Sequence, residues 1–235
     1  MCPETGGRPI VARQRILLMR HPETRENMAG VLSGRIDVDL TSRGEEQMRR
    51  AIEAVVAWEP DRIWCSPLSR CRSIAEEAAF RLGVECRVEP GLAEINFGSI
   101  QGMRMDAVHE LGYDFPWPLD ADGRSMPAPG AESFEDLLGR ARGVLAALEP
   151  LEGRTACISH GGMSRAILGA VFGTPLSTFW HVTLPNVSSQ ILTYGGGHFS
   201  LAALALAPEE VIRRMREPEL IGIDTTQNIS GRDAR

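Results

Sequence analysis

The chain has 235 residues, 43% of them hydrophobic and 24% charged, a balance typical of a soluble globular protein with a sizeable core. Its net charge of −6 at pH 7 argues against nucleic acid as a partner, because non-specific binding to nucleic acid needs a basic surface. No apolar run approaches a membrane span and the first 13 residues lack the apolar core of a secretory signal, so we expect a cytoplasmic protein with no membrane partner.

The absence of lysine and the spacing of the cysteines and histidines exclude several kinds of chemistry. All 25 basic residues are arginine, which excludes a Schiff-base lysine and a P-loop lysine but still allows bidentate phosphate binding. The five cysteines contain no C-x-x-C pair, so we expect buried free thiols. No His, Cys and Asp cluster has ligand spacing, and the sequence predicts neither a metal nor a cofactor.

The first predicted strand carries the first candidate site residues. Ile16–Met19 is a short continuous apolar run, typical of a strand buried on both faces, and Arg20 and His21 follow it directly. In open α/β sheets, ligands bind just beyond the carboxyl ends of the strands. The pair therefore marks a candidate ligand site, although an ordinary polar strand end would look the same.

The next four predicted elements, two helices and two strands, indicate the type of sheet. A helix is expected from Thr41 or Ser42 to about Pro60, a strand over 62–65, a helix ending near Gly83, and a strand over 84–88. This alternation of strands and helices favours a mostly parallel sheet with helices on both faces.

The segment 94–130 is irregular, with one expected helix over 103–111. Phe115 and Trp117 within it either line a substrate pocket or pack on the core. Ser133 is expected to cap a helix that carries apolar residues from Phe134 to Leu148.

A second strand end repeats the pattern of the first. The residues 154–159 form another short strand pattern, which ends at His160 and continues through Gly161 and Gly162 into a helix. A strand, a glycine turn and a helix N-terminus form a natural anion site, because free N–H groups and the helix dipole point outward there.

The residues 187–206 read as a hairpin. No linker divides the chain. We therefore expect a single domain over 1–235, with an N-terminal extension over 1–14 and a peripheral tail over 208–235.

Motifs in the right order resemble those of the histidine phosphatase superfamily, the phosphoglycerate-mutase-like proteins. The resemblance runs from about residue 15 to about residue 206. The matching segments are Arg20-His21-Pro22-Glu23-Thr24 with Asn27, Asp37 with Leu40-Thr41 and Gly44, Ser66-Pro67-Leu68-Ser69-Arg70, Leu92-Ala93-Glu94 with Phe97-Gly98 and Gly102, Gly130-Ala131-Glu132-Ser133, and Ser159-His160-Gly161-Gly162. The resemblance implies an α/β fold, a three-layer α/β/α architecture with a mostly parallel central sheet.

The resemblance also implies roles for individual residues. His21 would be the nucleophile that forms a phosphohistidine, and Glu94 would be the proton donor, with apolar neighbours that favour its protonated form. The other phosphate-pocket residues would be Arg20, Arg70 and His160, and the substrate-binding residues would be Asn27, Gly34, Gly161 and Asn186. The remaining histidines, at positions 109, 181 and 198, are read as structural or surface residues.

The expected function is therefore metal-independent hydrolysis of a small phosphorylated metabolite. Two alternatives stay open. A phosphomutase of this family would carry a longer insertion than the 38 positions that separate Glu94 from Glu132. A non-catalytic phosphate-binding protein is suggested by Pro22, which replaces the family's glycine, fixes φ and removes an N–H. Ser33 and Ser99-Ile100 also depart from the common pattern. The substrate and the oligomeric state, a homodimer being one alternative, are left open.

Overall fold

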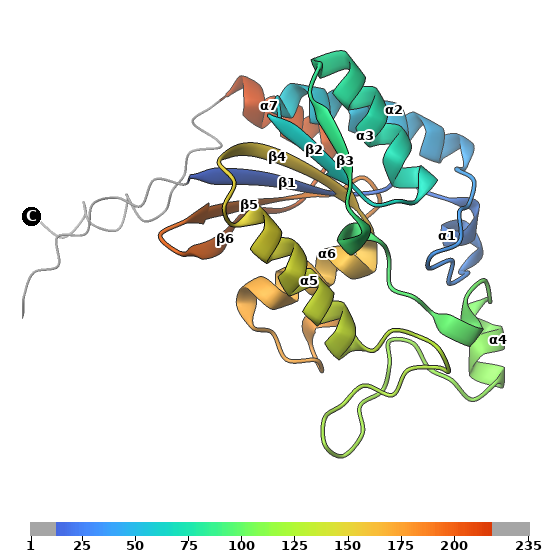
Figure 1. The fold of residues 1–235 in the computed structure, drawn as a ribbon. Helices are drawn as coiled ribbons and strands as arrows, with labels where there is room; N and C mark the ends of the chain where they lie inside the picture. The colour runs from blue at the N-terminus through green and yellow to red at the C-terminus, as the bar shows by residue number, and fades with distance from the viewer. Residues whose placement is uncertain (1–12, 218–235) are drawn as a thin grey trace, which may run out of the picture.

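The computed structural model describes residues 13–217, which form one six-stranded sheet covered by helices on both faces (Figure 1). The order of the strands across the sheet is β3-β2-β4-β1-β5-β6. The strands are β1 (Gln14–Arg20), β2 (Arg62–Cys65), β3 (Glu85–Val88), β4 (Gly153–Ser159), β5 (Ser189–Gly195) and β6 (His198–Leu206). The predicted α/β/α architecture is confirmed.

Five strands of the sheet run in the same direction, and only β5 is reversed. β1 pairs in parallel with β4, β4 with β2, and β2 with β3. The predicted hairpin is the β5–β6 pair, and β5 joins the sheet antiparallel to β1. The sheet is thus mostly parallel, as the strand and helix alternation predicts, and the hairpin extends it at one edge.

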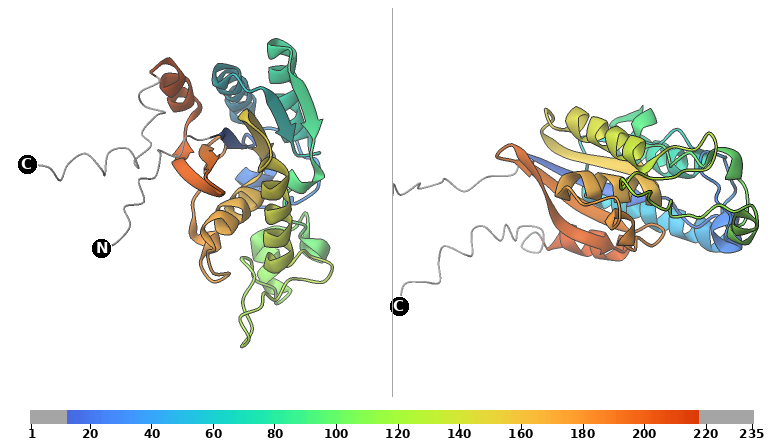
Figure 2. Two further views of the ribbon diagram at one scale, coloured as in Figure 1. Left: turned by 60° about the vertical axis from the view of Figure 1, so that its left-hand side comes forward. Right: turned by 90° about the horizontal axis from the view of Figure 1, so that it is seen from below.

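Two separate apolar clusters lie on the two faces of the sheet. Along β1, Ile16 and Leu18 face one cluster and Leu17 and Met19 face the other, since successive side chains of a strand point to opposite faces. Helices α5 and α6 cover the first face and α2, α3 and α7 cover the second (Figures 1 and 2). The helices are α1 (Arg25–Ala29), α2 (Ser42–Trp58), α3 (Ser69–Leu82), α4 (Met105–Glu110), α5 (Phe134–Leu148), α6 (Gly161–Phe172) and α7 (Pro208–Arg216), with 3-10 turns at Pro90–Leu92, Gly98–Ile100 and Phe179–His181. None of the helices within residues 13–217 is both long enough and apolar enough to cross a membrane.

Local signals in the sequence explain where the longer helices begin and end. The side chain of Thr41 accepts the N–H of Gly44 at the start of α2, and Ser133 accepts that of Asp136 at the start of α5. Gly83 ends α3 in the left-handed conformation. The helix expected over 103–111 is shorter, at Met105–Glu110, and the side chain of its N-cap residue, Arg104, makes no capping hydrogen bond.

The irregular segment between β3 and α5 packs on the first apolar cluster. Phe115 and Trp117 belong to an aromatic group with Phe97, Phe134 and Trp180, in which the Phe115 ring meets each of the other four edge to face. Trp117 is buried and donates its Nε1–H to the Glu132 carbonyl at 3.1 Å. Of the two readings of Phe115 and Trp117, packing on the core is the one observed.

The residues after β6 begin the segment expected to be a peripheral tail. Pro208–Arg216 is helix α7, which lies against α2, and its Val211 is fully buried in the second apolar cluster. The amphipathic pattern of Val211, Ile212 and Met215 is the cause, because those three side chains share one face of the helix. The extension before residue 13 and the chain after residue 217 lie outside the described residues.

The thiols within residues 13–217 are free. Cys65, Cys71 and Cys157 are buried and Cys86 is half-buried. Desolvation raises the pKa of Cys65 to about 12, so that thiol stays protonated at neutral pH. The predicted free thiols are confirmed for these four residues.

Candidate active site

The carboxyl ends of the parallel strands bring the two predicted histidines together. Arg20 at the end of β1 pairs in register with Ser159 at the end of β4, so His21 and His160 follow side by side. The His21 N–H donates to the Ser159 carbonyl at 2.9 Å, and the centroids of the two imidazole rings lie 5.1 Å apart. Residues that are 139 positions apart in sequence are thus neighbours at one edge of the sheet.

The His21 ring is held in one tautomer. Its Nδ1 lies 2.6 Å from the Pro22 carbonyl oxygen, which can only accept, so Nδ1 carries the proton and Nε2 keeps its lone pair. Burial, followed by the charges of Arg70 and Arg20, lowers the pKa of His21 well below its usual value. His21 is therefore a neutral imidazole at pH 7, with a nucleophilic nitrogen available.

The backbone of His21 is fixed from the opposite side by the residues before β5. Its carbonyl accepts the Asn186 Nδ2–H at 3.1 Å and the Val187 N–H at 3.3 Å. Val187 adopts φ of 53°, which is rare for a β-branched residue and costs on the order of 1–3 kcal/mol. Strain of this kind is typical of functional sites, and here it orients the N–H that holds His21.

Pro22 supplies what the His21 ring needs. The group that bonds Nδ1 is the carbonyl of residue 22, which proline retains. The N–H that proline removes is therefore not part of this hydrogen bond. The departure from the family's glycine leaves the tautomer of His21 intact.

Two arginines surround His21 with positive charge. Arg20 donates through Nη1 to the Leu184 carbonyl at 2.6 Å, and Arg70 donates through Nη1 and Nη2 to the carbonyls of Ile36 and Gly34 at 2.8 and 2.7 Å. In both arginines the Nε–H is buried and has no partner among the described residues. Unpaired buried donors of this kind are costly, and an anion bound in the pocket would satisfy them.

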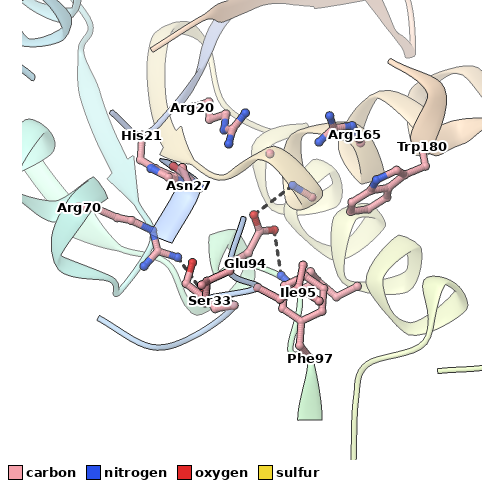
Figure 3. Close-up of a pocket in the computed structure, with 15 residues that line it drawn as sticks. Arg20, His21, Asn27, Ser33, Arg70, Glu94, Ile95, Phe97, Arg165 and Trp180 are labelled. Carbon is pink, nitrogen blue, oxygen red and sulfur yellow. Dashed lines mark hydrogen bonds between the residues drawn. The ribbon is translucent and has the colours of Figure 1, made fainter. Parts of the chain in front are cut away.

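Glu94 lies at the N-terminus of α6. Its Oε1 accepts the N–H groups of Ile95 at 2.9 Å and Met163 at 3.2 Å, and its Oε2 accepts that of Gly162 at 3.1 Å (Figure 3). A Cβ on Gly162 would overlap Oε1 of Glu94 and lie 3.1 Å from the Trp180 ring. The second glycine after His160 thus makes room for the carboxyl group.

Charged side chains behind Glu94 hold its backbone. Arg140 donates to the carbonyls of Ala93 at 2.6 Å and Glu94 at 3.3 Å, and Arg35 donates to the Glu94 carbonyl at 3.1 Å. Both arginines also bond Glu132, at 2.7 and 3.3 Å. Glu132 of the G-A-E-S motif therefore acts through the two arginines that fix the position of Glu94.

His160 and Asn186 lie behind the pocket wall and do not line it. His160 is fully buried, and its Nε2 shares a 2.6 Å hydrogen bond with Ser66 Oγ. Desolvation, followed by the charge of Arg70, lowers the pKa of His160 well below its usual value. Asn186 bonds the side chain of Asn27 at 3.2 Å. Both residues support lining residues, His160 through the His21 ring and Asn186 through Asn27.

The pocket is a cavity of about 150 Å³ that gathers most of the predicted site residues. Its lining includes seven of the nine: Arg20, His21, Asn27, Gly34, Arg70, Glu94 and Gly161 (Figure 3). The structure adds Arg165 and Trp180, which sequence reasoning missed.

Arg165 could have been found from the sequence by counting one helical turn from Gly161, at the start of the predicted helix. It lies four positions after Gly161 in the first turns of α6 and therefore shares a face with that residue. Trp180 carries no such signal, because the 3-10 turn at Phe179–His181 brings it to α6 from outside the motif.

Other polar groups of the fold are separate from this pocket. His109 on α4 is exposed and bonds Asp114 at 2.8 Å, and His198 is exposed at the start of β6. Within residues 13–217, no three or more His, Cys, Asp and Glu side chains are grouped so that they could hold a metal ion.

Comparison with known proteins identifies the family. Residues 16–206 match the model of the histidine phosphatase superfamily (branch 1), and the chain belongs to this family. Its relatives are phosphatases and phosphoglycerate-mutase-like proteins. The acid phosphatase of Mycobacterium tuberculosis is 30% identical over 200 residues, which cover 83% of this chain and 94% of that protein. Phosphoserine phosphatase 1 of Hydrogenobacter thermophilus is 28% identical over 76% of this chain and 85% of its own length. A Photorhabdus laumondii protein named "Probable phosphoglycerate mutase GpmB" is 30% identical over 76% of this chain and 84% of its own length.

Solved structures share the fold. Bacillus stearothermophilus YhfR superposes with a TM-score of 0.72 at 25% identity, covering 81% of this chain and 96% of that one. A mycobacterial glucosyl-3-phosphoglycerate phosphatase in complex with VO3 superposes with a TM-score of 0.69 at 25% identity, covering 80% and 97%.

Proposed function

We propose that this protein is a phosphomonoesterase that hydrolyses a small phosphorylated metabolite through a phosphohistidine on His21, without a metal ion. The observation that carries the proposal is the state of His21. It is a buried neutral imidazole with Nδ1 bonded to the Pro22 carbonyl, and it lies beside two arginines whose Nε–H groups have no partner among the described residues. These are the nucleophile and the charge that phosphoryl transfer requires.

In the first step, Nε2 of His21 attacks the phosphorus of the ester. The N–P bond forms, the bond from phosphorus to the ester oxygen breaks, and Glu94 in its protonated form gives its proton to the leaving alkoxide. Arg20 and Arg70 compensate the charge on the phosphoryl oxygens. An alcohol leaves, and the enzyme carries phosphohistidine and a Glu94 carboxylate.

In the second step, water attacks the phosphorus of phosphohistidine. Glu94 takes a proton from the water, the N–P bond breaks, and the electron pair returns to Nε2. Inorganic phosphate leaves, and His21 and Glu94 return to their starting states. The names of the relatives support phosphoryl chemistry but differ in the substrate, so they do not select one.

The test is phosphate release from a panel of phosphomonoesters in EDTA, with His21→Ala as the variant and His198→Ala as the control. We expect turnover in EDTA, a loss on the order of a thousandfold or more in His21→Ala, and no loss in the control, because His198 is exposed outside the pocket. Rapid quenching with a labelled ester should trap an acid-labile phosphate on the wild-type protein and none on His21→Ala.

Three outcomes would contradict the proposal. Turnover that EDTA abolishes would show a metal requirement. Interconversion of phosphoglycerates without phosphate release would favour a mutase. Binding of phosphoesters without turnover would favour a non-catalytic protein.

A further inference from the structure

Two of the free thiols lie close together near one edge of the sheet. Cys65 is the last residue of β2 and Cys86 lies in the edge strand β3, and their Sγ atoms are 4.0 Å apart. Both side chains point to the same face of the sheet, because Cys65 is a member of the second apolar cluster and Cys86 packs against it. Cys65 is fully buried and Cys86 is half-buried, so the pair lies at the border between the core and solvent.

The register of the two strands is unfavourable for a disulfide between these cysteines. Cys65 is paired with Val88 and Cys86 with Ile63, so the two cysteines are offset by two positions along the strands. With about 3.3 Å per residue along a parallel strand and about 4.8 Å between strands, their Cα atoms are roughly 8 Å apart. Cysteines whose Cα atoms are more than about 7 Å apart cannot be bridged without movement of the backbone. Direct bonding of the two sulfur atoms would therefore require β3 to slide along β2.

A single metal ion fits between the two sulfur atoms at the observed separation. Metal–thiolate bonds are about 2.3 Å long, so two sulfur atoms 4.0 Å apart can both bind one ion, with an angle of about 120° at the ion. Structural zinc takes four protein ligands, and within residues 13–217 no three or more His, Cys, Asp and Glu side chains are grouped to hold a metal ion. The pair therefore suits an ion that is satisfied by two thiolates and one ligand from solvent. Copper(I) is an ion of this kind, because it is soft and prefers sulfur ligands.

The surroundings of the pair keep both thiols protonated until an ion binds. Burial raises the pKa of Cys65 to about 12 and also raises the pKa of Cys86. The charge of Glu76 on α3 adds to both shifts, Glu85 adds to that of Cys86, and Arg72 on α3 opposes both. An ion that binds to both sulfur atoms near neutral pH must therefore displace two protons.

We propose that Cys65 and Cys86 form a binding site for a soft monovalent metal ion, copper(I), which cross-links the edge strand β3 to β2. On binding, each thiol releases its proton to solvent and each sulfur atom gives an electron pair to the ion. Two thiols and one copper(I) ion thus form a complex with a charge of −1 and release two protons, with no transfer of electrons between redox partners. Neither cysteine lines the pocket around His21, so the inference does not depend on the proposed function.

The test measures the copper(I) affinity of the full chain by competition with the chelator bicinchoninate in the absence of oxygen. We expect one tight site in the wild-type protein and a loss of affinity on the order of 100-fold or more in Cys86→Ala, because one thiolate is left instead of two. Cys65→Ala should show the same loss. If that variant fails to fold, Cys86→Ala alone decides, since its side chain is half-buried at the edge of the sheet.

Matched variants and two further readouts separate this site from binding by any thiol. Cys157→Ala removes a buried thiol in the cluster on the other face of the sheet and should keep the wild-type affinity, as should Cys2→Ala. After correction for protonation of the chelator, the logarithm of the affinity should rise by about 2 per pH unit in the wild type and by about 1 in Cys86→Ala, one for each proton displaced. Copper(I) should also slow amide hydrogen exchange over residues 85–88 in the wild type and leave it unchanged in Cys86→Ala.

Three outcomes would overturn the inference. Equal copper(I) affinity in the wild type and Cys86→Ala, or loss of the site in Cys2→Ala or Cys157→Ala, would place the ion elsewhere. Zinc(II) binding as tight as that of copper(I) would show that the site is not one for a soft ion with few ligands. Rapid formation of a Cys65–Cys86 disulfide with glutathione disulfide, detected by mass analysis of peptides, would contradict the strand geometry and assign the pair to thiol exchange instead.

Discussion

At the scale of single residues, the site depends on histidines that are kept neutral by burial. Desolvation and the nearby arginines lower the pKa of both His21 and His160. Neutral His21 is ready to act as a nucleophile, whereas a protonated one would have no lone pair on Nε2. The same burial makes the two histidines a source of acid sensitivity for the whole fold.

We predict that the free energy of unfolding falls as pH drops below about 6.5, the usual pKa of histidine. In that range the unfolded chain binds protons that native His21 and His160 exclude, so acid favours unfolding. Well below pH 6.5 each histidine contributes a slope of about 1.4 kcal/mol per pH unit. Urea unfolding at a series of pH values from 7.5 to 5 measures it.

Two variants provide the comparison. His160→Gln removes one of the two histidines and should lower the slope by about half, because one neutral buried imidazole is left. His198→Gln, at an exposed position, should keep the wild-type slope. Equal slopes in all three proteins would show that the buried histidines do not set the acid sensitivity.

At the scale of elements, the junction of β4 and α6 does the most for the site. His160 ends the strand pattern, and the first residues of α6 then provide free N–H groups for the Glu94 carboxyl group. Arg140 and Arg35 fix the same glutamate from the backbone side. The proposed proton donor is therefore held by α6 on its carboxyl side and by Arg140 and Arg35 on its backbone side.

We predict that Gly162→Ala lowers kcat by on the order of tenfold or more, because the new Cβ would displace the Glu94 carboxyl group. The loss should be larger for an alkyl phosphate than for p-nitrophenyl phosphate, whose leaving group needs little protonation. Steady-state kinetics with both esters measures the difference.

Gly139→Ala is the matched control, since Gly139 lies in helix α5 with nothing within 4 Å of a new Cβ. It should retain activity and raise the free energy of unfolding by up to about 1 kcal/mol. An equal loss for both esters in Gly162→Ala would argue against proton donation by Glu94.

At the scale of the whole molecule, the sheet divides the interior into two clusters with different relations to the site. The pocket residues Ile95 and Phe97 belong to the cluster under α5 and α6. The cluster under α2, α3 and α7 includes Val211, far along the chain from every lining residue. A substitution in the second cluster can therefore change the stability of the protein without changing its activity.

We predict that Val211→Ala lowers the free energy of unfolding by on the order of 2 kcal/mol, since the side chain is fully buried and its loss leaves a cavity. KM for any substrate should stay at the wild-type value. Denaturant unfolding and steady-state kinetics on the same sample test both parts. A large change in KM would show that α7 is coupled to the pocket through the sheet.

Much of the fold follows from periodicity in the sequence. Short apolar runs such as Ile16–Met19 predict buried strands because both faces are covered, and helical spacing from Phe134 to Leu148 predicts α5. The convergence of His21 with His160 follows from the strand ends of a parallel sheet. Arg165 and Trp180 do not follow, because their meeting depends on how a short turn far along the chain packs against α6.

The position of Trp180 means that its fluorescence can report whether a ligand occupies the pocket. The other three tryptophans, Trp58, Trp64 and Trp117, are buried, whereas Trp180 is half-buried and lines the cavity. Its indole is the one of the four that exchanges water for ligand when the pocket fills. Emission excited near 295 nm should therefore change on titration with inorganic phosphate or a phosphoester, and the change should disappear in Trp180→Phe. Occupancy becomes visible without any label attached to the chain.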